Sequence, residues 1–215
     1  MTAKPRKKTA KKKPAAKKAQ TQKVKAKPLS IWNPSAIVST MFSSGRLSPA
    51  PGTWGSLWGV ILFPLFLYFT LYVSTGSKSI FTVAIGGAAV LVLLYSVGIV
   101  AIEKYQSHTK THDGKEIVYD EFFGQILTYS IITIYYLASA YRYNIQYNQD
   151  INLNKALFYQ FTPFIFFRIF DIIKPYPISR ADRDLKGAHG VMIDDVLAAI
   201  YAAVCSILVF WLLDS

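Results

Sequence analysis

The stretch GAHGVMIDDVLAAIYAAVCSILVFWLL, residues 187–213, has two adjacent carboxylates at the start of a long apolar run. From residue 193 onward, the run holds no charge other than Asp194 and Asp195. About 20 such residues cross the hydrocarbon core of a bilayer, so the stretch predicts a membrane-spanning helix. Charged groups in such helices are unfavourable and usually face a functional interior. The pair is therefore either a helix cap or part of a reactive site.

Four further apolar runs precede this one. Those at 57–75 and 80–102 are long enough to span a bilayer, whereas those at 122–140 and 156–173 are more polar or shorter. The alternative for the latter two is a pair of core helices that lie in the membrane interface. The fold class that we predict is all-α, a multi-pass integral membrane helical bundle of four to five membrane-embedded helices.

The charge of the chain is concentrated near its N-terminus. Residues 1–28 contain twelve Lys or Arg and no acid, which accounts for the whole formal net charge of +12. The segment has no apolar period, so we predict that it is disordered. We therefore divide the chain into a disordered Lys-rich cytoplasmic tail, residues 1–30, and a membrane-embedded domain, residues 31–215.

The basic tail has two physical interpretations. It can bind an anionic membrane surface, at about 1 kcal/mol per basic residue near the surface, or it can bind the phosphates of nucleic acid. No recognised nucleic-acid fold accompanies the tail, so the membrane surface is favoured. The positive-inside rule then places the N-terminus in the cytoplasm.

The acidic residues form two clusters. None precedes Glu103, five lie within 103–121 and five lie within 171–195. If the tail is cytoplasmic and all five runs cross, both clusters reach the cytoplasmic face. Magnesium prefers carboxylate oxygens and leaves room for substrate phosphate, so we predict a Mg²⁺ site at this face. Solvated interfacial charge is the alternative.

Two motifs contain half of these acids. In VYDEFFGQ, residues 118–125, Asp120 and Glu121 open an apolar helix; capping explains one acid, but two adjacent acids repel unless a cation lies nearby. Gly124 lets another helix come close. In FFRIFDIIKPYPISRADRD, residues 166–184, the charged side chains of the helical part share one face at spacings of three: Arg168, Asp171 and Lys174. This alternation of sign continues through Arg183 and suits a phosphate bound together with a metal; a salt-bridged helix end is the alternative.

A third motif, GRLSPAPGTWGSLWG at 45–59, precedes the first long apolar run. Its backbone amides and the hydroxyls of Ser48, Thr53 and Ser56 can cradle an anion at a helix start, although such a loop is often only a turn. The sequence lacks the residues that other classes of phosphate-handling enzyme require. The single cysteine, Cys205, lies inside an apolar run, and no GxxxxGK[ST] occurs.

The three motifs together resemble a known family. APGTWGSL (50–57), VYDEFFGQ and FRIFDIIKPYPISRADRDLKGAHGVMIDDVLAAIYA (167–202) are similar to the signature blocks of bacterial phosphatidylglycerophosphatase A. The resemblance implies a multi-pass inner-membrane enzyme that requires magnesium. It implies removal of the terminal phosphate of phosphatidylglycerophosphate at the cytoplasmic face, which gives phosphatidylglycerol.

The resemblance also implies the roles of individual residues. The catalytic residues would be Asp120, Glu121, Asp171, Lys174, Asp194 and Asp195, and the five acids among them would bind Mg²⁺. Arg168 would accompany them as a substrate-binding residue, and the charge and hydroxyl patterns described above add Arg183, Thr53 and Ser56 to the predicted substrate-binding residues. Where the family commonly has a glycine pair, this chain has Gly187 and Ala188 followed by His189, which we expect to fill a gap rather than transfer protons.

Several alternatives remain open at this stage. The nucleophile is either water or an aspartate that forms a phosphoenzyme. A membrane phosphotransferase would use the same metal chemistry, but its usual DG..AR run is absent from DGKEIV at 113–118. A non-catalytic membrane anchor with a tail that binds nucleic acid is the other alternative.

Overall fold

The computed structural model describes residues 29–74, 79–110, 114–143 and 153–214. The predicted tail, residues 1–30, lies almost entirely outside these ranges. Every regular element within them is helical, which confirms the predicted all-α class.

Five long helices form the bundle. They are α2 (Pro51–Val73), α3 (Ile80–Thr109), α4 (Tyr119–Tyr143), α5 (Leu153–Ile173) and α7 (Gly187–Asp214). All five are long and apolar enough to cross a membrane, so the more polar runs also form helices of spanning length. Three shorter elements were not predicted: α1 (Pro34–Ser39), the 3₁₀ turn η1 (Ser44–Arg46) and α6 (Ile178–Asp184).

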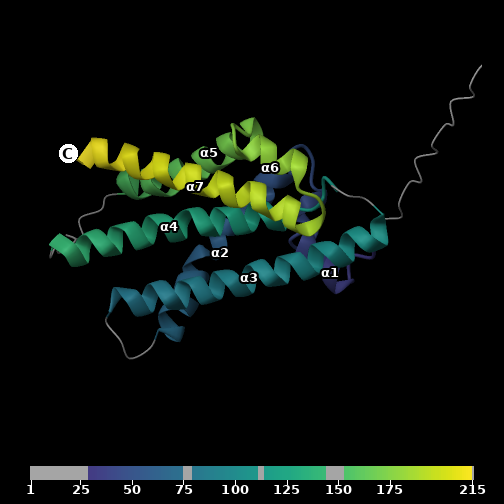
Figure 1. The fold of residues 1–215 in the computed structure, drawn as a ribbon, viewed down its shortest axis with the longest axis horizontal. Helices are drawn as coiled ribbons and strands as arrows, with labels where there is room; N and C mark the ends of the chain where they lie inside the picture. Colours follow the sequence, from purple (N-terminus) through teal and green to yellow (C-terminus); the bar gives the residue numbers. More distant parts are fainter. Residues whose placement is uncertain (1–28, 75–78, 111–113, 144–152, 215) are drawn as a thin grey trace, which may run out of the picture.

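Successive long helices run in alternating directions (Figure 1). Helix α4 packs against both α2 and α7, and α7 also packs against α5 and α6. The N-terminal turns of α2, α4 and α7 therefore meet the last turn of α5 at one end of the bundle, which we call the polar end. Both predicted acidic motifs are carried to this end.

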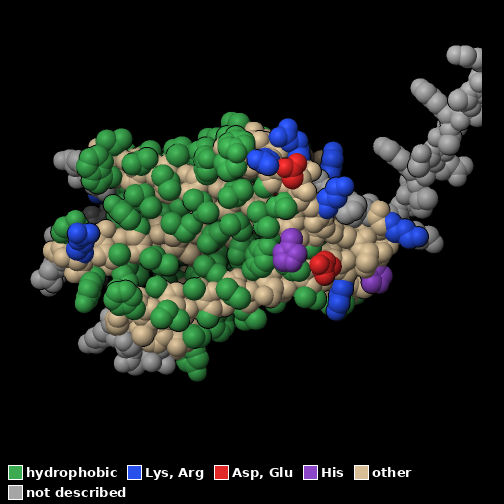
Figure 2. Space-filling view, viewed as in Figure 1, with side chains coloured by type: hydrophobic (Ala, Val, Ile, Leu, Met, Phe, Trp, Pro, Cys, Tyr) green, Lys and Arg blue, Asp and Glu red, His purple; other side chains and the backbone are tan. Residues whose placement is uncertain are grey.

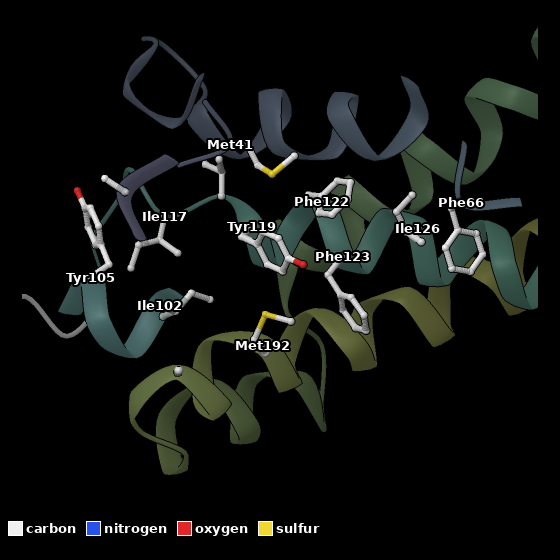
Figure 3. Packing of buried hydrophobic residues seen from close by; sticks show 13 residues of the cluster. Met41, Phe66, Ile102, Tyr105, Ile117, Tyr119, Phe122, Phe123, Ile126 and Met192 are labelled. Atoms are coloured by element: carbon white, nitrogen blue, oxygen red, sulfur yellow. The ribbon is translucent and has the colours of Figure 1, made fainter. Parts of the chain in front are cut away.

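A cluster of buried apolar side chains fixes the helices next to the polar end (Figure 3). Tyr119 of α4 and Met192 of α7 point toward each other there, and Ile102 of α3 is fully buried beside them. The Tyr119 hydroxyl donates a hydrogen bond to the carbonyl oxygen of Leu94 at 2.9 Å. This packing sets the positions of α3, α4 and α7 relative to one another.

The outer surface is apolar over most of the face seen in Figure 2. Large side chains such as Ile85, Leu93 and Trp211 are more than 60% exposed. A continuous apolar surface of this kind is typical of a protein solvated by lipid. The Lys and Arg side chains in this view lie at the two ends of the molecule. The arrangement agrees with a multi-pass membrane bundle.

Helix α7 begins earlier than the apolar run that predicted it. It starts at Gly187 rather than residue 193, and no acid lies in its first turn. Asp194 and Asp195 are therefore two turns inside the helix, and the helix-cap alternative for them is wrong. The early start is possible because Ala188 is buried and because Gly190, without a Cβ, packs closely on the backbone of Leu185.

Candidate active site

A cavity of about 630 Å³ opens at the polar end of the bundle. The start of α2, the α3–α4 connection, α4, the last turn of α5, α6 and α7 all contribute to its walls. Six acids line it: Asp120, Glu121, Asp171, Asp182, Asp194 and Asp195. The five acids expected from the motifs therefore share one cavity, and Asp182 joins them.

Three of these acids form a tight cluster. One carboxylate oxygen from each of Asp120, Glu121 and Asp195 lies within 4.8 Å of the other two. Each residue also has a buried oxygen without a hydrogen-bond partner among the described residues: Asp120 Oδ1, Glu121 Oε2 and Asp195 Oδ2. Three negative charges this close repel one another unless a cation joins them. An all-oxygen donor set with free lone pairs fits Mg²⁺.

The cluster depends on close contact between helices α4, α5 and α7. A Cβ atom on Gly124 would lie 2.5 Å from Phe167 Cζ and 3.2 Å from the carbonyl oxygen of Asp195. The absence of a side chain at residue 124 lets the third turn of α7 lie against the second turn of α4. The close approach expected at Gly124 is confirmed.

The start of α2 is pressed against the same cluster. A Cβ on Gly52 would collide with Glu121 Oε1 and would lie 2.9 Å from a guanidinium nitrogen of Arg168. Gly52 also lines the cavity. The third motif thus brings the backbone at the start of α2 close to the side chains of Glu121 and Arg168.

Arg168 is the cation nearest to the cluster. Its Nη1 lies 2.6 Å from Asp171 Oδ2 and 4.0 Å from Glu121 Oε1, and it donates to Ser56 Oγ at 3.3 Å. The Arg168 and Asp171 side chains are only 15% and 13% exposed. Low exposure strengthens such a pair, so Asp171 is held closely by Arg168, whereas Glu121, the clustered acid that pairs with the same guanidinium, is 4.0 Å away.

Lys174 does not share the face of Arg168 and Asp171, so that prediction is wrong. Helix α5 ends at Ile173, and Lys174 adopts a left-handed conformation with φ of 45°. Its Nζ donates to Asp182 Oδ1 at 2.6 Å and to Asp194 Oδ2 at 2.5 Å. Lys174 therefore ties the end of α5 to α6 and α7.

The two carboxylates keep Lys174 charged. Burial acts to lower the pKa of Lys174, but the hydrogen bonds to Asp182 and Asp194 and the charges of these acids raise it above the ordinary lysine value. Asp194, whose side chain is 7% exposed, gains a permanent cationic partner.

The remaining predicted residues have different surroundings. Arg183 lines the cavity, whereas Ser48 and Thr53 do not. Ser56 is fully buried, and its hydroxyl donates to the carbonyl oxygen of Gly52 at 3.1 Å while accepting from Arg168. His189 is exposed and does not line the cavity, and its Nδ1 lies 3.0 Å from the Tyr95 hydroxyl.

Two polar residues of interest were not predicted as site residues. Asp182 lines the cavity and accepts a hydrogen bond from Lys174, a partner that the spacing of charges in its motif did not indicate. Gln125 is fully buried, and neither of its amide atoms has a hydrogen-bond partner in the described part of the chain. The sequence feature that could have pointed to Gln125 is its position four residues after Glu121, which puts both side chains on the same face of the helix.

Comparison with known proteins identifies the family. The family model for Phosphatidylglycerophosphatase A matches residues 37–210, which include every element lining the cavity. The chain belongs to this family. As a phosphatidylglycerophosphatase A family member, it is an enzyme of the phosphatase class.

Relatives of this phosphatase match over most of their length. It is 33% identical to Phosphatidylglycerophosphatase A of Haemophilus influenzae, covering 87% of this chain and 96% of that one. It is 28% identical to Phosphatidylglycerophosphatase A of Escherichia coli, covering 81% and 83%. A protein of Bacteroides thetaiotaomicron with the provisional name of a phosphatidylinositol-3-phosphatase is 32% identical, covering 82% and 94%. No solved structure matches the chain.

Proposed function

We propose that this phosphatase removes the terminal phosphate of phosphatidylglycerophosphate in a magnesium-dependent reaction, giving phosphatidylglycerol and inorganic phosphate. The observation that carries the proposal is the cluster of Asp120, Glu121 and Asp195, with three oxygens within 4.8 Å of one another. The names of the Haemophilus and Escherichia relatives support the choice of substrate.

The cavity residues have distinct parts in this reaction. Asp120, Glu121 and Asp195 would hold Mg²⁺, with Asp171 and Asp194 beside them, and the bound ion supplies polarisation of the phosphoryl oxygens. A cavity carboxylate orients the attacking water and takes its proton. The water oxygen bonds to phosphorus as the bond from phosphorus to the glycerol oxygen breaks, and that oxygen then takes up a proton.

Two cations offset charge around the reacting phosphate. Arg168 is held by Asp171 and Ser56 next to Glu121, so its position does not depend on substrate. Lys174 is held in the same way by Asp182 and Asp194. Preorganised charges of this kind stabilise a transition state without rearrangement.

The apolar surface supports a setting for the reaction in the bacterial inner membrane. The acyl chains of the substrate stay in the bilayer, and only the headgroup enters the cavity. We place the cavity and the N-terminus on the cytoplasmic side, where the basic tail meets anionic lipid.

The test is phosphate release by the purified protein from short-chain phosphatidylglycerophosphate, with Mg²⁺ and with a chelator. We expect release that the chelator abolishes and that added Mg²⁺ restores. Release that survives chelation would contradict the metal requirement. A parallel assay on short-chain phosphatidylinositol 3-phosphate tests the headgroup, because release from that lipid alone would replace the proposed substrate.

A further inference from the structure

The cavity carries opposite charges at its floor and at its rim. The floor holds the clustered acids, of which Asp195 is 2% exposed. The rim holds three exposed cations that also line the cavity: Lys115, Arg183 and Lys186. Lys115 comes from the α3–α4 connection, Arg183 from α6 and Lys186 from the α6–α7 connection. We call these three residues the cationic rim.

The cationic rim differs from the other charges of the cavity in lacking partners. Lys174 is committed to Asp182 and Asp194, and Arg168 is committed to Asp171. No hydrogen bond or ion pair joins Lys115, Arg183 or Lys186 to any other residue in the described ranges. Three unpaired cations around one opening attract an anion from solution or from a lipid headgroup.

The proposed substrate carries two phosphates that differ in chemistry. Its terminal phosphate is a monoester and is the group that is hydrolysed, whereas the phosphate that joins glycerol to the lipid is a diester and stays on the product. The acidic floor needs a metal before it can accept the monoester. The rim needs no metal to accept a singly charged diester. A cavity of about 630 Å³ lies within the usual range for small-molecule sites and has room for both phosphates.

We propose that the cationic rim is a second phosphate subsite, which binds the phosphodiester of the lipid while the terminal phosphate reaches the acidic floor. This inference rests on the proposed function, and it identifies the rim residues as the ones that select the lipid headgroup. Lys115 and Lys186 are the rim residues that were not predicted to bind substrate. They recognise the part of the substrate that does not react, and the same contacts hold the phosphatidylglycerol product.

A direct binding experiment separates this proposal from catalysis. Dioctanoyl phosphatidylglycerol, which carries only the diester, is titrated into the detergent-purified full chain by calorimetry, with dioctanoylglycerol as the uncharged lipid. Inorganic phosphate is titrated separately in the presence of Mg²⁺. We expect each of Lys115→Ala, Arg183→Ala and Lys186→Ala to weaken phosphatidylglycerol binding about threefold to fivefold, and the triple variant to weaken it at least tenfold. Inorganic phosphate binding should stay within about twofold.

Two matched variants make the result specific. Lys104→Ala removes an exposed cation of α3 that does not line the cavity, and it should leave phosphatidylglycerol binding unchanged. Lys115→Arg combined with Lys186→Arg keeps the charge and should bind like the unmodified protein.

Three outcomes would overturn the subsite. The first is phosphatidylglycerol binding by the triple variant that is as tight as that of the unmodified protein. The second is an equal loss of phosphatidylglycerol affinity in Lys104→Ala. The third is a loss of affinity for inorganic phosphate in the triple variant as large as its loss for the lipid. The last outcome would assign the rim to free phosphate. A chain that binds phosphatidylglycerol through the rim but releases no phosphate from phosphatidylglycerophosphate would contradict the proposed function and leave the subsite standing.

Discussion

The candidate site holds three carboxylates close together, although their like charges favour separation. They belong to Asp120, Glu121 and Asp195. Their oxygens lie within 4.8 Å of one another, and like charges at such distances repel by several kcal/mol at the effective dielectric of a protein interior. Folding energy from the surrounding helix contacts must offset that repulsion. Functional sites often retain destabilising groups of this kind.

Asp195→Asn tests this conflict. The amide keeps the shape of the carboxylate but removes one negative charge, so we expect phosphate release to fall at least about 100-fold. In chelator, the same variant should unfold at an equal or higher temperature than the unmodified protein, because one repulsion is gone. Asp184→Asn is the control, since Asp184 is exposed, pairs with Arg180 and does not line the cavity. Equal activity of the two variants would exclude Asp195 from the metal site.

Gly52→Ala tests the close approach of α2 to the cluster. Alanine favours a helix over glycine by about 1 kcal/mol, so a loss of activity would not arise from helix propensity. We expect at least a tenfold loss, because the added Cβ displaces Glu121 or Arg168, and small displacements at a reacting centre are costly. Thr53→Ala, one residue away and outside the cavity lining, should stay within about twofold. The measurement is kcat for both variants.

Among the helices, the break between α5 and α6 decides where Lys174 points. A helix continued past Ile173 would carry Lys174 onto the face of Arg168. The left-handed turn at Lys174 directs its ammonium group toward α6 and α7 instead. The link joins three elements through one side chain.

Lys174→Met tests this link. Methionine keeps the apolar length of the side chain but leaves Asp194 buried without its cation, which is destabilising. We expect a lower unfolding temperature and about a tenfold lower kcat. Arg180→Met removes a pair whose side chains are more than 60% exposed and should change little. If both variants behave alike, Lys174 has no special role.

The stabilising effect of Lys174 should depend on pH only in the alkaline range. Because the folded state raises the pKa of Lys174, its stabilising effect is fully present below the ordinary lysine pKa of about 10.4 and is lost as the pH rises through the folded value. The difference in unfolding temperature between the unmodified protein and Lys174→Met should therefore be constant from about pH 7 to pH 9. A difference that closes within this range would contradict the assignment.

The sequence predicted the long helices well and their ends poorly. Apolar length identifies a span because lipid requires about 20 apolar residues, and all five runs became helices. The start of α7 was missed because residues 187–192 contain two glycines and a histidine, and their helical state depends on packing against α6. Short α6 has too few residues for a periodic pattern.

The candidate site was predicted in membership but not in arrangement. The predictions named five of the six acids that line the cavity, since paired carboxylates stand out in an apolar sequence. They did not show that Asp171 and Asp194 each pair closely with a cation, whereas Glu121 lies 4.0 Å from Arg168 and its cluster with Asp120 and Asp195 holds oxygens without a partner among the described residues. That division depends on contacts between residues as far apart as 52 and 121, which local spacing does not encode.

For the whole molecule, the charge distribution between tail and body makes a separate prediction. Deleting residues 1–28 removes twelve basic residues and no acid, and leaves a body of zero formal charge. We expect the shortened chain, reconstituted from detergent, to hydrolyse short-chain soluble substrate at an unchanged rate. Its attachment to anionic vesicles, measured by co-sedimentation before insertion, should weaken and lose its dependence on salt. Equal attachment by both chains would refute a role of the tail in lipid binding.

The cavity draws its walls from α2 near the beginning of the bundle and from α7 at its end, and this has a consequence for biosynthesis. A nascent chain that has emerged only as far as α6 already has four of the five long helices, yet it lacks Asp195 and has no complete carboxylate cluster. On the proposed function, the enzyme gains its reactive centre only when the last helix has entered the membrane. Ribosome stalling or truncation upstream of residue 195 would leave an inserted but silent protein.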